Sequence, residues 1–415
     1  MYTARVERPP KPPRSVPDHD VPSTVRAVVA LLTARGHAAY LVGGCVRDLL
    51  TGESSGDFDI ATSASPEQVL ELLPLAIPIG LRHGTVMLPT GDGPVDITSF
   101  RAGPDIEADL GHRDFSINAM AFDPEKGALI DPYGGRNDLA DRRLRAVGSA
   151  EDRFREDPLR ILRAARLVAT LELTLDPEVE ATMAKLRAGL RGVARERVRS
   201  EIEQMLLAPN AARGLELLRR TRIEADLAPG TAPDAVAVVG ALPTDRDLRL
   251  AGWLRGTDAE RILRRLRFPR RTAQRVAHLL GHHPIGADLN PKRDAAVRKL
   301  IKSAGEKNLA ALYTLREVEI GVAEDAVTAA ASLDQLRSVR AAIARVRQAG
   351  ALALRRLDLA IDGREVMALL GCGPGRSVGQ ALRRLTDRVI EDPALNTPEH
   401  LRSLLERWAS DRRDS

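Results

Sequence analysis

Residues 38–42 form a short apolar run that ends at two consecutive glycines, Gly43 and Gly44, and a segment typical of a short helix follows. The run predicts a buried strand, and the glycines let backbone N–H groups approach an anion closely. The N-terminus of the helix that they open favours a triphosphate. Arg47 lies in its first turn, where a planar guanidinium grips phosphate oxygens with two hydrogen bonds. The pattern therefore predicts a phosphate site between a strand and a helix.

Two carboxylates follow shortly afterwards. Asp57 and Asp59 alternate with Phe58 and Ile60, as in a half-buried strand, so both carboxylates lie on one face. Two like charges so close repel each other unless a cation lies between them. Magnesium bound by carboxylates and substrate phosphates is the usual solution, and two ions roughly 3.5–4 Å apart would serve an in-line phosphoryl displacement. Either motif alone is usually just a turn or a solvated strand edge, but both within one strand-turn-helix-strand unit indicate nucleotidyl transfer.

Several separate blocks extend these two motifs along the chain. They are Val95–Arg101, Arg113–Ala121, Ile130–Gly135, Arg153–Arg166, Asp358–Gly363, Gly373–Gly375 and Asn396. With them, the chain resembles the class II family of tRNA nucleotidyltransferases and bacterial poly(A) polymerases, which belongs to the polymerase-beta-like superfamily. The resemblance runs from about residue 38 to the C-terminus.

The resemblance implies roles for individual residues. It implies that Asp57 and Asp59 hold two magnesium ions. It also implies contacts with the incoming nucleotide, its sugar or its phosphates, for Gly44, Arg47, Arg113 and Asp114. Asp96 is either a third carboxylate near the metals or a polar residue that faces solvent on a neighbouring strand, and the residues leave both readings open.

The block that contains Asp157 and Arg160 suggests how a base is selected. Cytosine and adenine each present an amino donor beside a ring-nitrogen acceptor, whereas uracil and guanine present an acceptor beside an N–H donor. One carboxylate and one guanidinium therefore accept C and A and reject U and G, and sites of this kind discriminate by roughly four to five powers of ten. Asp157 and Arg160 are three residues apart on a predicted helix, so we expect them to face one base edge together. Arg163 and Arg166 continue this spacing, and the family uses them for nucleotide contacts; the alternative is an exposed ladder of ion pairs that includes Glu156.

Two departures from the family pattern bear on the reaction. His112 stands where many members carry an arginine. The stretch between Arg101 and Arg113 has only about eleven residues, whereas members that complete the CCA end usually have a longer flexible loop there, and relatives that add only CC tend to lack it. We expect full CCA addition, with a CC-adding enzyme and a poly(A) polymerase as alternatives. A catalytically silent RNA-binding protein is the alternative from a different class.

Composition agrees with a large globular protein. The 415 residues suffice for two or more structural units, and 44% apolar with 29% charged residues exclude a disordered chain. The net charge of +5 gives only a modest indication of a polyanionic partner. Aromatic residues make up 3%, which favours an RNA acceptor held by shape and backbone contacts over one held by stacked bases. No run approaches about eighteen apolar residues, so we expect a cytoplasmic protein without a membrane segment; the oligomeric state stays open.

We therefore expect an α+β fold, with a polymerase-beta-like head of mixed sheet and helices followed by an all-helical neck, body and tail. Strand-like runs lie at 38–42, 57–61, 84–88 and 94–100, and the pattern beyond about residue 150 is almost wholly helical. Within the neck, Arg195–Val198 resembles the family motif that braces the nucleotide helix. The expected divisions are a mobile Pro-rich arm (1–21), a nucleotidyltransferase head (22–148), a neck with the nucleotide-selecting helix (149–228), and an RNA-binding body and tail (229–415). The expected substrates are CTP, ATP and the tRNA 3′ end, with Mg²⁺ as cofactor.

Overall fold

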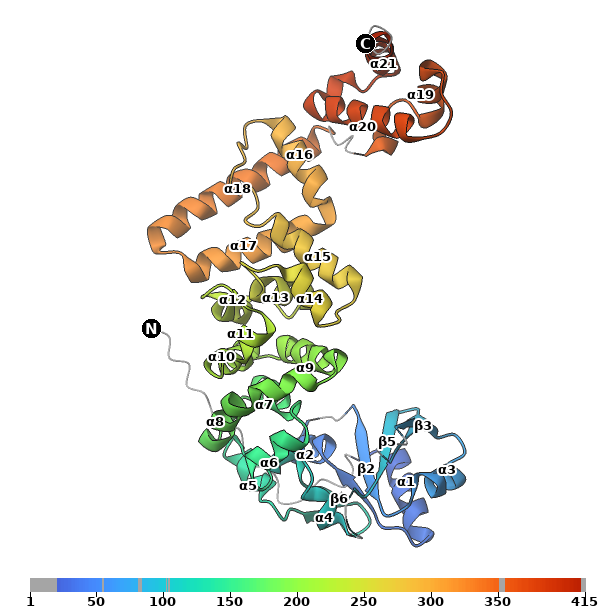
Figure 1. Ribbon diagram of the computed structural model, residues 1–415, viewed down its shortest axis with the longest axis vertical. Helices are drawn as coiled ribbons and strands as arrows, with labels where there is room; N and C mark the ends of the chain where they lie inside the picture. The colour runs from blue at the N-terminus through green and yellow to red at the C-terminus, as the bar shows by residue number, and fades with distance from the viewer. Residues whose placement is uncertain are drawn as a thin grey trace. The chain divides into compact units, whose positions relative to one another are not determined.

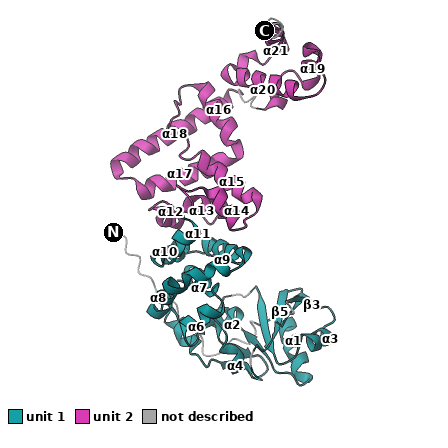
Figure 2. Cartoon of the chain, viewed as in Figure 1, with its two compact units in different colours: residues 1–229 teal, residues 230–415 magenta. Residues whose placement is uncertain are grey.

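The computed structural model describes residues 21–53, 56–80, 84–101, 103, 105–350 and 355–411 (Figure 1). All but the last residue of the expected Pro-rich arm lies outside the described residues. The chain divides into two compact units, Met1–Pro229 and Gly230–Ser415, which are coloured separately in Figure 2.

A seven-stranded mixed sheet, with the strand order β3-β4-β5-β2-β1-β6-β7, forms the centre of the head in unit 1. Its strands are β1 (Ala39–Val42), β2 (Phe58–Thr62), β3 (Ile77–Gly80), β4 (Thr85–Thr90), β5 (Gly93–Ser99), β6 (Ala121–Asp123) and β7 (Ala128–Ile130). Strands β2 and β5 are parallel, and the other neighbours are antiparallel. The four strands expected from the sequence, β1, β2, β4 and β5, are confirmed to within two residues at each end.

Helices around the sheet fix the strand ends that carry the polar motifs. In the head these helices are α1 (Ser23–Ala34), α2 (Gly44–Thr51), α3 (Pro66–Leu72), α4 (Ile106–Leu110) and α5 (Gly135–Ala140). One buried cluster joins Val42 of β1, Ala61 of β2 and Leu110 of α4. These side chains are almost completely buried. Their packing therefore fixes β1, β2 and α4 relative to one another in the head.

The neck of unit 1 is mostly helical. Its helices are α6 (Ala150–Glu156), α7 (Arg160–Leu171), α8 (Pro177–Leu186), α9 (Arg195–Leu207), α10 (Ala211–Arg220) and α11 (Ile223–Leu227). Helix α7 packs against α9 and α10. The expectation of a neck without strands is wrong in one detail, because β9 (Thr174–Leu175) pairs in parallel with β8 (Arg143–Leu144) and ties the neck back to the head.

The expected continuous helix through Asp157 and Arg160 is also wrong. Helix α6 ends at Glu156, Asp157 has an extended backbone, and α7 begins only at Arg160. The physical reason is Pro158, since a proline disfavours the helical conformation of the residue before it. Asp157 therefore lies at a break between two helices, although it remains close to Arg160 along the chain.

Regular structure in the described part of unit 2 is helical. Its α-helices are α12 (Ala235–Ala241), α13 (Arg246–Trp253), α14 (Ala259–Arg265), α15 (Arg270–Gly281), α16 (Asp294–Ala304), α17 (Leu309–Ala323), α18 (Ala326–Gln348), α19 (Gly363–Leu370), α20 (Arg376–Glu391) and α21 (Pro398–Asp411). The late sequence motifs have structural partners here: Asp362 caps α19, and the Asn396 amide bonds the backbone of Asp358 and Ala360. Among the described helices, none is both long and apolar enough to cross a membrane.

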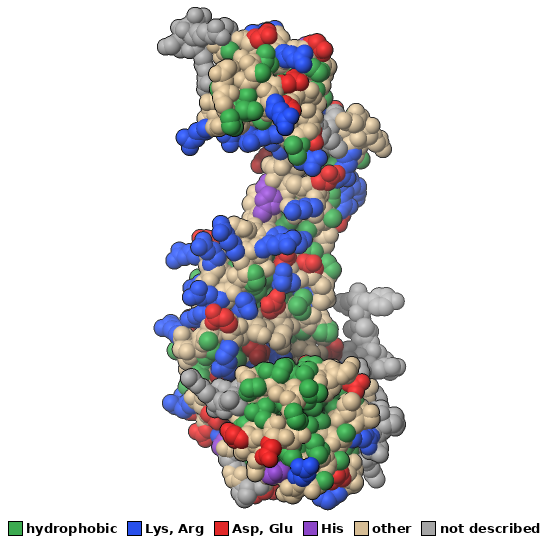
Figure 3. All heavy atoms as spheres, turned by 90° about the vertical axis from the view of Figure 1, so that its right-hand side faces the viewer, with side chains coloured by type: hydrophobic (Ala, Val, Ile, Leu, Met, Phe, Trp, Pro, Cys, Tyr) green, Lys and Arg blue, Asp and Glu red, His purple; other side chains and the backbone are tan. Residues whose placement is uncertain are grey.

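The surface of unit 1 is not uniformly polar. Hydrophobic side chains gather on the face that carries β3 and α3 (Figure 3). Large apolar side chains at and beside the edge strand β3 are exposed, namely Leu75, Ile77 and Ile79. Pro78 lies within β3 and cannot donate a backbone hydrogen bond, which protects an edge strand against pairing with another chain.

Candidate active site

A cavity of about 540 Å³ in unit 1 brings all ten predicted site residues together. They are Gly44, Arg47, Asp57, Asp59, Arg113, Asp114, Asp157, Arg160, Arg163 and Arg166. The cavity volume lies in the range of small-ligand sites. Seven arginines and five aspartates line the cavity, so its walls suit a polyanion that arrives with divalent cations.

The glycine turn lies directly against two of the charged side chains. Gly43 has φ 79° and ψ −134°, a backbone conformation that glycine adopts without strain. A Cβ atom at this position would lie 2.8 Å from Nη1 of Arg113 and 3.4 Å from Oδ2 of Asp59. Helix α2 begins at Gly44 without a side-chain cap, so its N-terminus is suited to an anion.

Three aspartates lie at neighbouring positions of the sheet. Asp59 of β2 is in register with Asp96 of the parallel strand β5, and Asp57 directly precedes β2. Burial raises the pKa of Asp59; Arg113 opposes this shift, and the carboxylates of Asp96 and Asp57 add to it. Burial and then Asp57 also raise the pKa of Asp96.

Such crowded carboxylates fit a hard divalent cation, which would offset both the burial and the mutual repulsion. No group of three or more His, Cys, Asp or Glu residues within the described ranges forms a metal cage by itself. A pair of carboxylates that shares its metal ions with substrate phosphates does not need such a cage. Asp57 and Asp59 are therefore suitable ligands.

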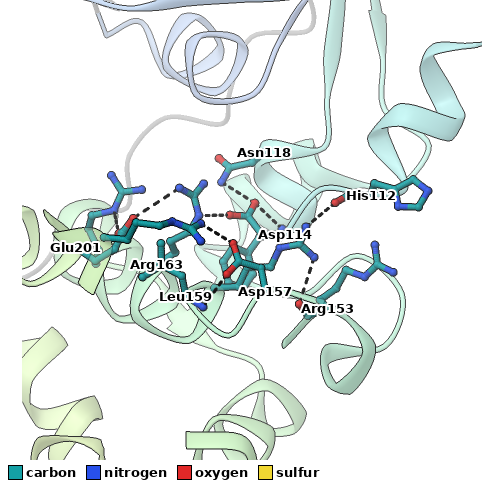
Figure 4. A network of polar contacts seen from close by, with 12 residues as sticks. His112, Asp114, Asn118, Arg153, Asp157, Leu159, Arg163 and Glu201 are labelled. Carbon is teal, nitrogen blue, oxygen red and sulfur yellow. Dashed lines mark hydrogen bonds and ion pairs between the residues drawn. The ribbon is translucent and has the colours of Figure 1, made fainter. Parts of the chain in front are cut away.

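A polar network centred on Asp114 occupies one wall of the cavity (Figure 4). Its Oδ2 accepts a hydrogen bond from Nε of Arg163 at 2.7 Å. Its Oδ1 accepts from the Asn118 amide at 3.2 Å and from the Phe115 backbone N–H at 2.9 Å. Burial alone would raise the pKa of Asp114, but the Arg163 guanidinium and the hydrogen bonds outweigh it and hold the pKa below its usual range. Asp114 is thus a fixed, ionised acceptor.

Arg47 is held in the same network. Its Nη1 donates to Oδ1 of Asn118 at 2.8 Å, and its Nε donates to Asp48 at 2.9 Å. Asn118 has no role predicted from the sequence, although it belongs to the block Arg113–Ala121. The signal that could have found it is its place four residues after Asp114 in that block. Other cavity-lining polar residues without a predicted role are Asp48, Arg101 and Thr170.

Asp157 is already engaged on both of its carboxylate oxygens. Oδ1 accepts from the backbone N–H of Leu159 at 3.1 Å. Oδ2 accepts from Nη2 of Arg197, on α9, at 2.7 Å. A carboxylate has about four lone-pair positions, so these two bonds orient Asp157 and leave capacity for the amino group of a base.

Arg160 is buried and braced by the elements around it. Its Nη1 donates to Glu156 at 2.8 Å, and its Nη2 donates to the backbone oxygen of His112 at 2.8 Å. Nη1 also reaches the carbonyl of Arg153 at 3.3 Å. A guanidinium has five N–H donors. The Nε–H of Arg160 makes no hydrogen bond within the described part of the chain, so this edge is available to a ring nitrogen.

Helix α9 braces the two later arginines of α7. Glu201 is buried and lies 2.8 Å from Nε of Arg166 and 3.8 Å from Nη1 of Arg163. Gln204 accepts from Nη1 of Arg166 at 2.6 Å. The alternative of an exposed ladder of ion pairs does not hold for Arg163, because its partners Asp114 and Glu201 lie on other elements. Both guanidinium groups are oriented by α9 while they line the cavity.

The short stretch between Arg101 and Arg113 contains the packed helix α4, and residues 102 and 104 lie outside the described residues. Ile106 and Leu110 of α4 are buried. The buried Asp109 accepts from the Arg101 backbone N–H at 3.1 Å and from Nη2 of Arg113 at 3.4 Å. This stretch therefore holds both flanking arginines at the cavity.

Comparisons with known proteins agree with this architecture. Residues 39–145 match the model of the poly A polymerase head domain, and residues 172–234 match that of a probable RNA- and SrmB-binding site of polymerase A. The CCA-adding enzyme of Geobacillus stearothermophilus is 32% identical over 408 residues, which cover 90% of this chain and 94% of that enzyme. The crystal structure of the Bacillus stearothermophilus CCA-adding enzyme in complex with CTP superposes with a TM-score of 0.74 at 30% identity and covers 94% of this chain and 98% of that one.

A further relative performs a shorter reaction. The CC-adding tRNA nucleotidyltransferase of Shouchella clausii is 42% identical over 193 residues, which cover 46% of this chain and 50% of that protein. The mixed sheet, the glycine turn and the carboxylates beside it are those of a nucleotidyltransferase whose family generally uses a divalent metal. The chain belongs to the class II family of CCA-adding enzymes and bacterial poly(A) polymerases, as its motifs indicated.

Proposed function

We propose that this chain is a tRNA nucleotidyltransferase that adds C and A residues to the 3′ end of tRNA from CTP and ATP, without a nucleic-acid template. One observation supports this above all: a single cavity of about 540 Å³ collects a phosphate turn, a carboxylate pair and a carboxylate–guanidinium pair for a base. Each part has a separate task in the transfer of a nucleotide.

The triphosphate binds at the turn before α2. Backbone N–H groups at the start of α2, together with Arg47 and Arg113, bind and orient its oxygens. Asp114, held ionised by Arg163, accepts a hydrogen bond from the sugar. Asp57 and Asp59 would hold Mg²⁺, which when bound would activate the attacking hydroxyl and stabilise the leaving pyrophosphate.

Base selection uses Asp157 and Arg160. Asp157 accepts from the amino group of cytosine or adenine, and the Nε–H of Arg160 donates to the ring nitrogen beside it. Arg197 and the His112 carbonyl hold the two side chains in place. Uracil or guanine would leave the half-buried Asp157 and the buried Arg160 without these partners beneath the bound base, which is costly for a polar site.

The expected domains and location remain predictions that belong to this proposal. The region 149–228 carries the base-selecting residues, and 229–415 binds the body of the tRNA. The enzyme works in the cytoplasm, where CTP, ATP and tRNA are available.

The test is gel analysis at single-nucleotide resolution with purified protein and Mg²⁺. Transcripts of tRNA that end at the discriminator base, at C or at CC are offered CTP and ATP, separately and together. We expect extension of all three to CCA and no extension beyond it. Long ATP-only tails on unstructured RNA would instead identify a poly(A) polymerase.

A second candidate is an enzyme that stops at CC. It is favoured by the short stretch between Arg101 and Arg113 and by the likeness to the CC-adding enzyme of Shouchella clausii. In the same assay it would extend the first two transcripts to CC and leave the transcript that already ends in CC unchanged with ATP.

Two aspartate variants of the head test the proposed metal site and provide its control. Asp57→Ala should abolish incorporation while the thermal unfolding midpoint stays close to that of the wild type, because Asp57 is exposed. Asp141→Ala, an equally exposed aspartate of the head that does not line the cavity, should retain activity. Full activity of Asp57→Ala would refute the proposed site.

A further inference from the structure

Asn118 joins two parts of the site that come from different elements. It ends a short 3₁₀ helix, η3 (Ser116–Asn118), and is only 6% exposed. Its Oδ1 accepts from Nη1 of Arg47 at 2.8 Å, and its Nδ2 donates to Oδ1 of Asp114 at 3.2 Å. A guanidinium can only donate and a carboxylate can only accept. The two partners therefore fix the orientation of the amide, which an isolated asparagine would leave ambiguous.

We propose that Asn118 is a positioning residue that couples the phosphate end of the nucleotide site to its sugar end. This inference rests on the proposed function, in which Arg47 binds phosphate and Asp114 binds the sugar. Asn118 makes direct hydrogen bonds to both of these residues, and Asp114 is in turn bonded to Arg163 on α7. A displacement of Arg47 by the phosphates is thus transmitted through one rigid amide to the acceptor of the sugar.

The amide is suited to this position because it is neutral and carries both a donor and an acceptor. An aspartate at position 118 would keep the acceptor for Arg47 but would place a second carboxylate about 3.2 Å from Asp114. Like charges at that separation destabilise each other strongly in a buried site. A leucine of similar size would lose both hydrogen bonds and leave two buried charged groups with one partner fewer.

The experiment compares Asn118→Asp with Ser116→Ala. Ser116 lies on the same 3₁₀ helix, but its hydroxyl bonds Asp138 at 2.5 Å and does not line the cavity. Two quantities are measured for each variant: CTP and dCTP binding by calorimetry without tRNA, and kcat/KM for incorporation of CMP and dCMP into tRNA. Thermal unfolding confirms that each variant is folded.

For Asn118→Asp we expect weaker CTP binding, by roughly 10- to 100-fold for a lost hydrogen bond to charged groups. We also expect the preference for CTP over dCTP to fall, since Asp114 no longer has a fixed place. Ser116→Ala should lower thermal stability and leave that preference at the wild-type value. In a double-mutant cycle, Asn118→Asp is combined with Arg47→Lys. The loss of CTP-binding free energy in the double variant should be smaller than the sum of the losses in the two single variants.

A folded Asn118→Asp variant with the wild-type ratio of CTP to dCTP binding, or with effects strictly additive to those of Arg47→Lys, would overturn the coupling. The binding measurement also separates this inference from the proposed function. Wild-type protein that binds CTP but extends no tRNA would refute the proposed function. The ratio of CTP to dCTP binding in Asn118→Asp would still decide the role of Asn118. Wild-type protein that binds no CTP would refute both.

Discussion

Replacement of Gly43 by alanine tests the close packing of the phosphate turn against the charged side chains. Gly43 has a positive φ that strains any other residue, and an added Cβ would lie 2.8 Å from Nη1 of Arg113. The contact involves the far end of a flexible side chain. We therefore expect the guanidinium of Arg113 to move and to lose the phosphate contact proposed for this side chain.

The backbone strain sets the expected loss of stability. A residue held in such a region costs of the order of 1–3 kcal/mol. For a unit of about two hundred residues this corresponds to a drop of roughly 2 to 12 °C in the unfolding midpoint. Displacement of Arg113 adds a functional loss, because a hydrogen bond to a charged group is worth about 1.5–3 kcal/mol. We expect kcat/KM for CTP to fall about 10- to 100-fold.

Gly52→Ala is the matched control. Gly52 ends the same helix, α2, with φ 76° and ψ 20°, and an added Cβ would meet no atom within 4 Å. It carries a comparable backbone strain of about 1–2 kcal/mol without a neighbour to displace. Both variants are assayed for CMP incorporation well below their unfolding midpoints. The reasoning is refuted if Gly43→Ala retains wild-type kcat/KM, or if Gly52→Ala loses as much as Gly43→Ala does.

Three other changes probe the base-selecting pair, the packing of the head and the charges of unit 2. Arg197→Ala removes one of the two hydrogen bonds that orient Asp157, and we expect UMP misincorporation relative to CMP to rise in single-turnover assays. In Gly135→Ala a Cβ would lie 2.1 Å from the Ser116 backbone oxygen, so we expect little soluble, folded protein in expression and thermal-unfolding trials. Burial raises the pKa of Glu319, but a histidine and two arginines outweigh this and hold it at about 2, against 4.5 in an unfolded chain. The contribution of the ionised Glu319 to the free energy of unfolding should therefore be complete above pH 4.5 and disappear as the pH falls towards 2. Glu319→Gln should flatten the dependence of the unfolding midpoint on pH in this range.

The fold was predictable where the sequence pattern has one physical explanation. The spacing of apolar residues indicates strands around the glycine turn. In the long helices of unit 2 it indicates helix. The strands β6 and β7 were missed because three residues are too short for a period to emerge, and β3, which is as short as β1, has no pair of consecutive glycines after it. The pair β8–β9 was missed for a further reason: each strand has only two residues, and its partner lies about thirty residues away in the chain.

The residues of the site were predictable from the sequence, but most of the hydrogen bonds and ion pairs between them were not. All ten expected residues line one cavity, because each sits in a motif whose residue types are tied to a chemistry. The partners of Arg163 were not predictable, since Asp114 and Glu201 lie 49 and 38 residues away in the sequence. The one connection that the sequence indicated is that of Asp157, because its partner Arg197 belongs to Arg195–Val198, the segment that resembles the bracing motif of the neck.

These connections explain why the break at Pro158 is compatible with the proposed base selection. On one continuous helix, Asp157 and Arg160 would be oriented by the helix alone. With the helix interrupted, Asp157 is oriented instead by Arg197 of α9, and Arg160 by the His112 carbonyl that directly follows α4 and Gly111. The two groups proposed to read a base are therefore held by different elements: Asp157 by α9, and Arg160 by Glu156 at the end of α6 together with the carbonyl of His112. In the proposed site, loss of Arg197 removes one partner of Asp157 and leaves the three partners of Arg160 in place.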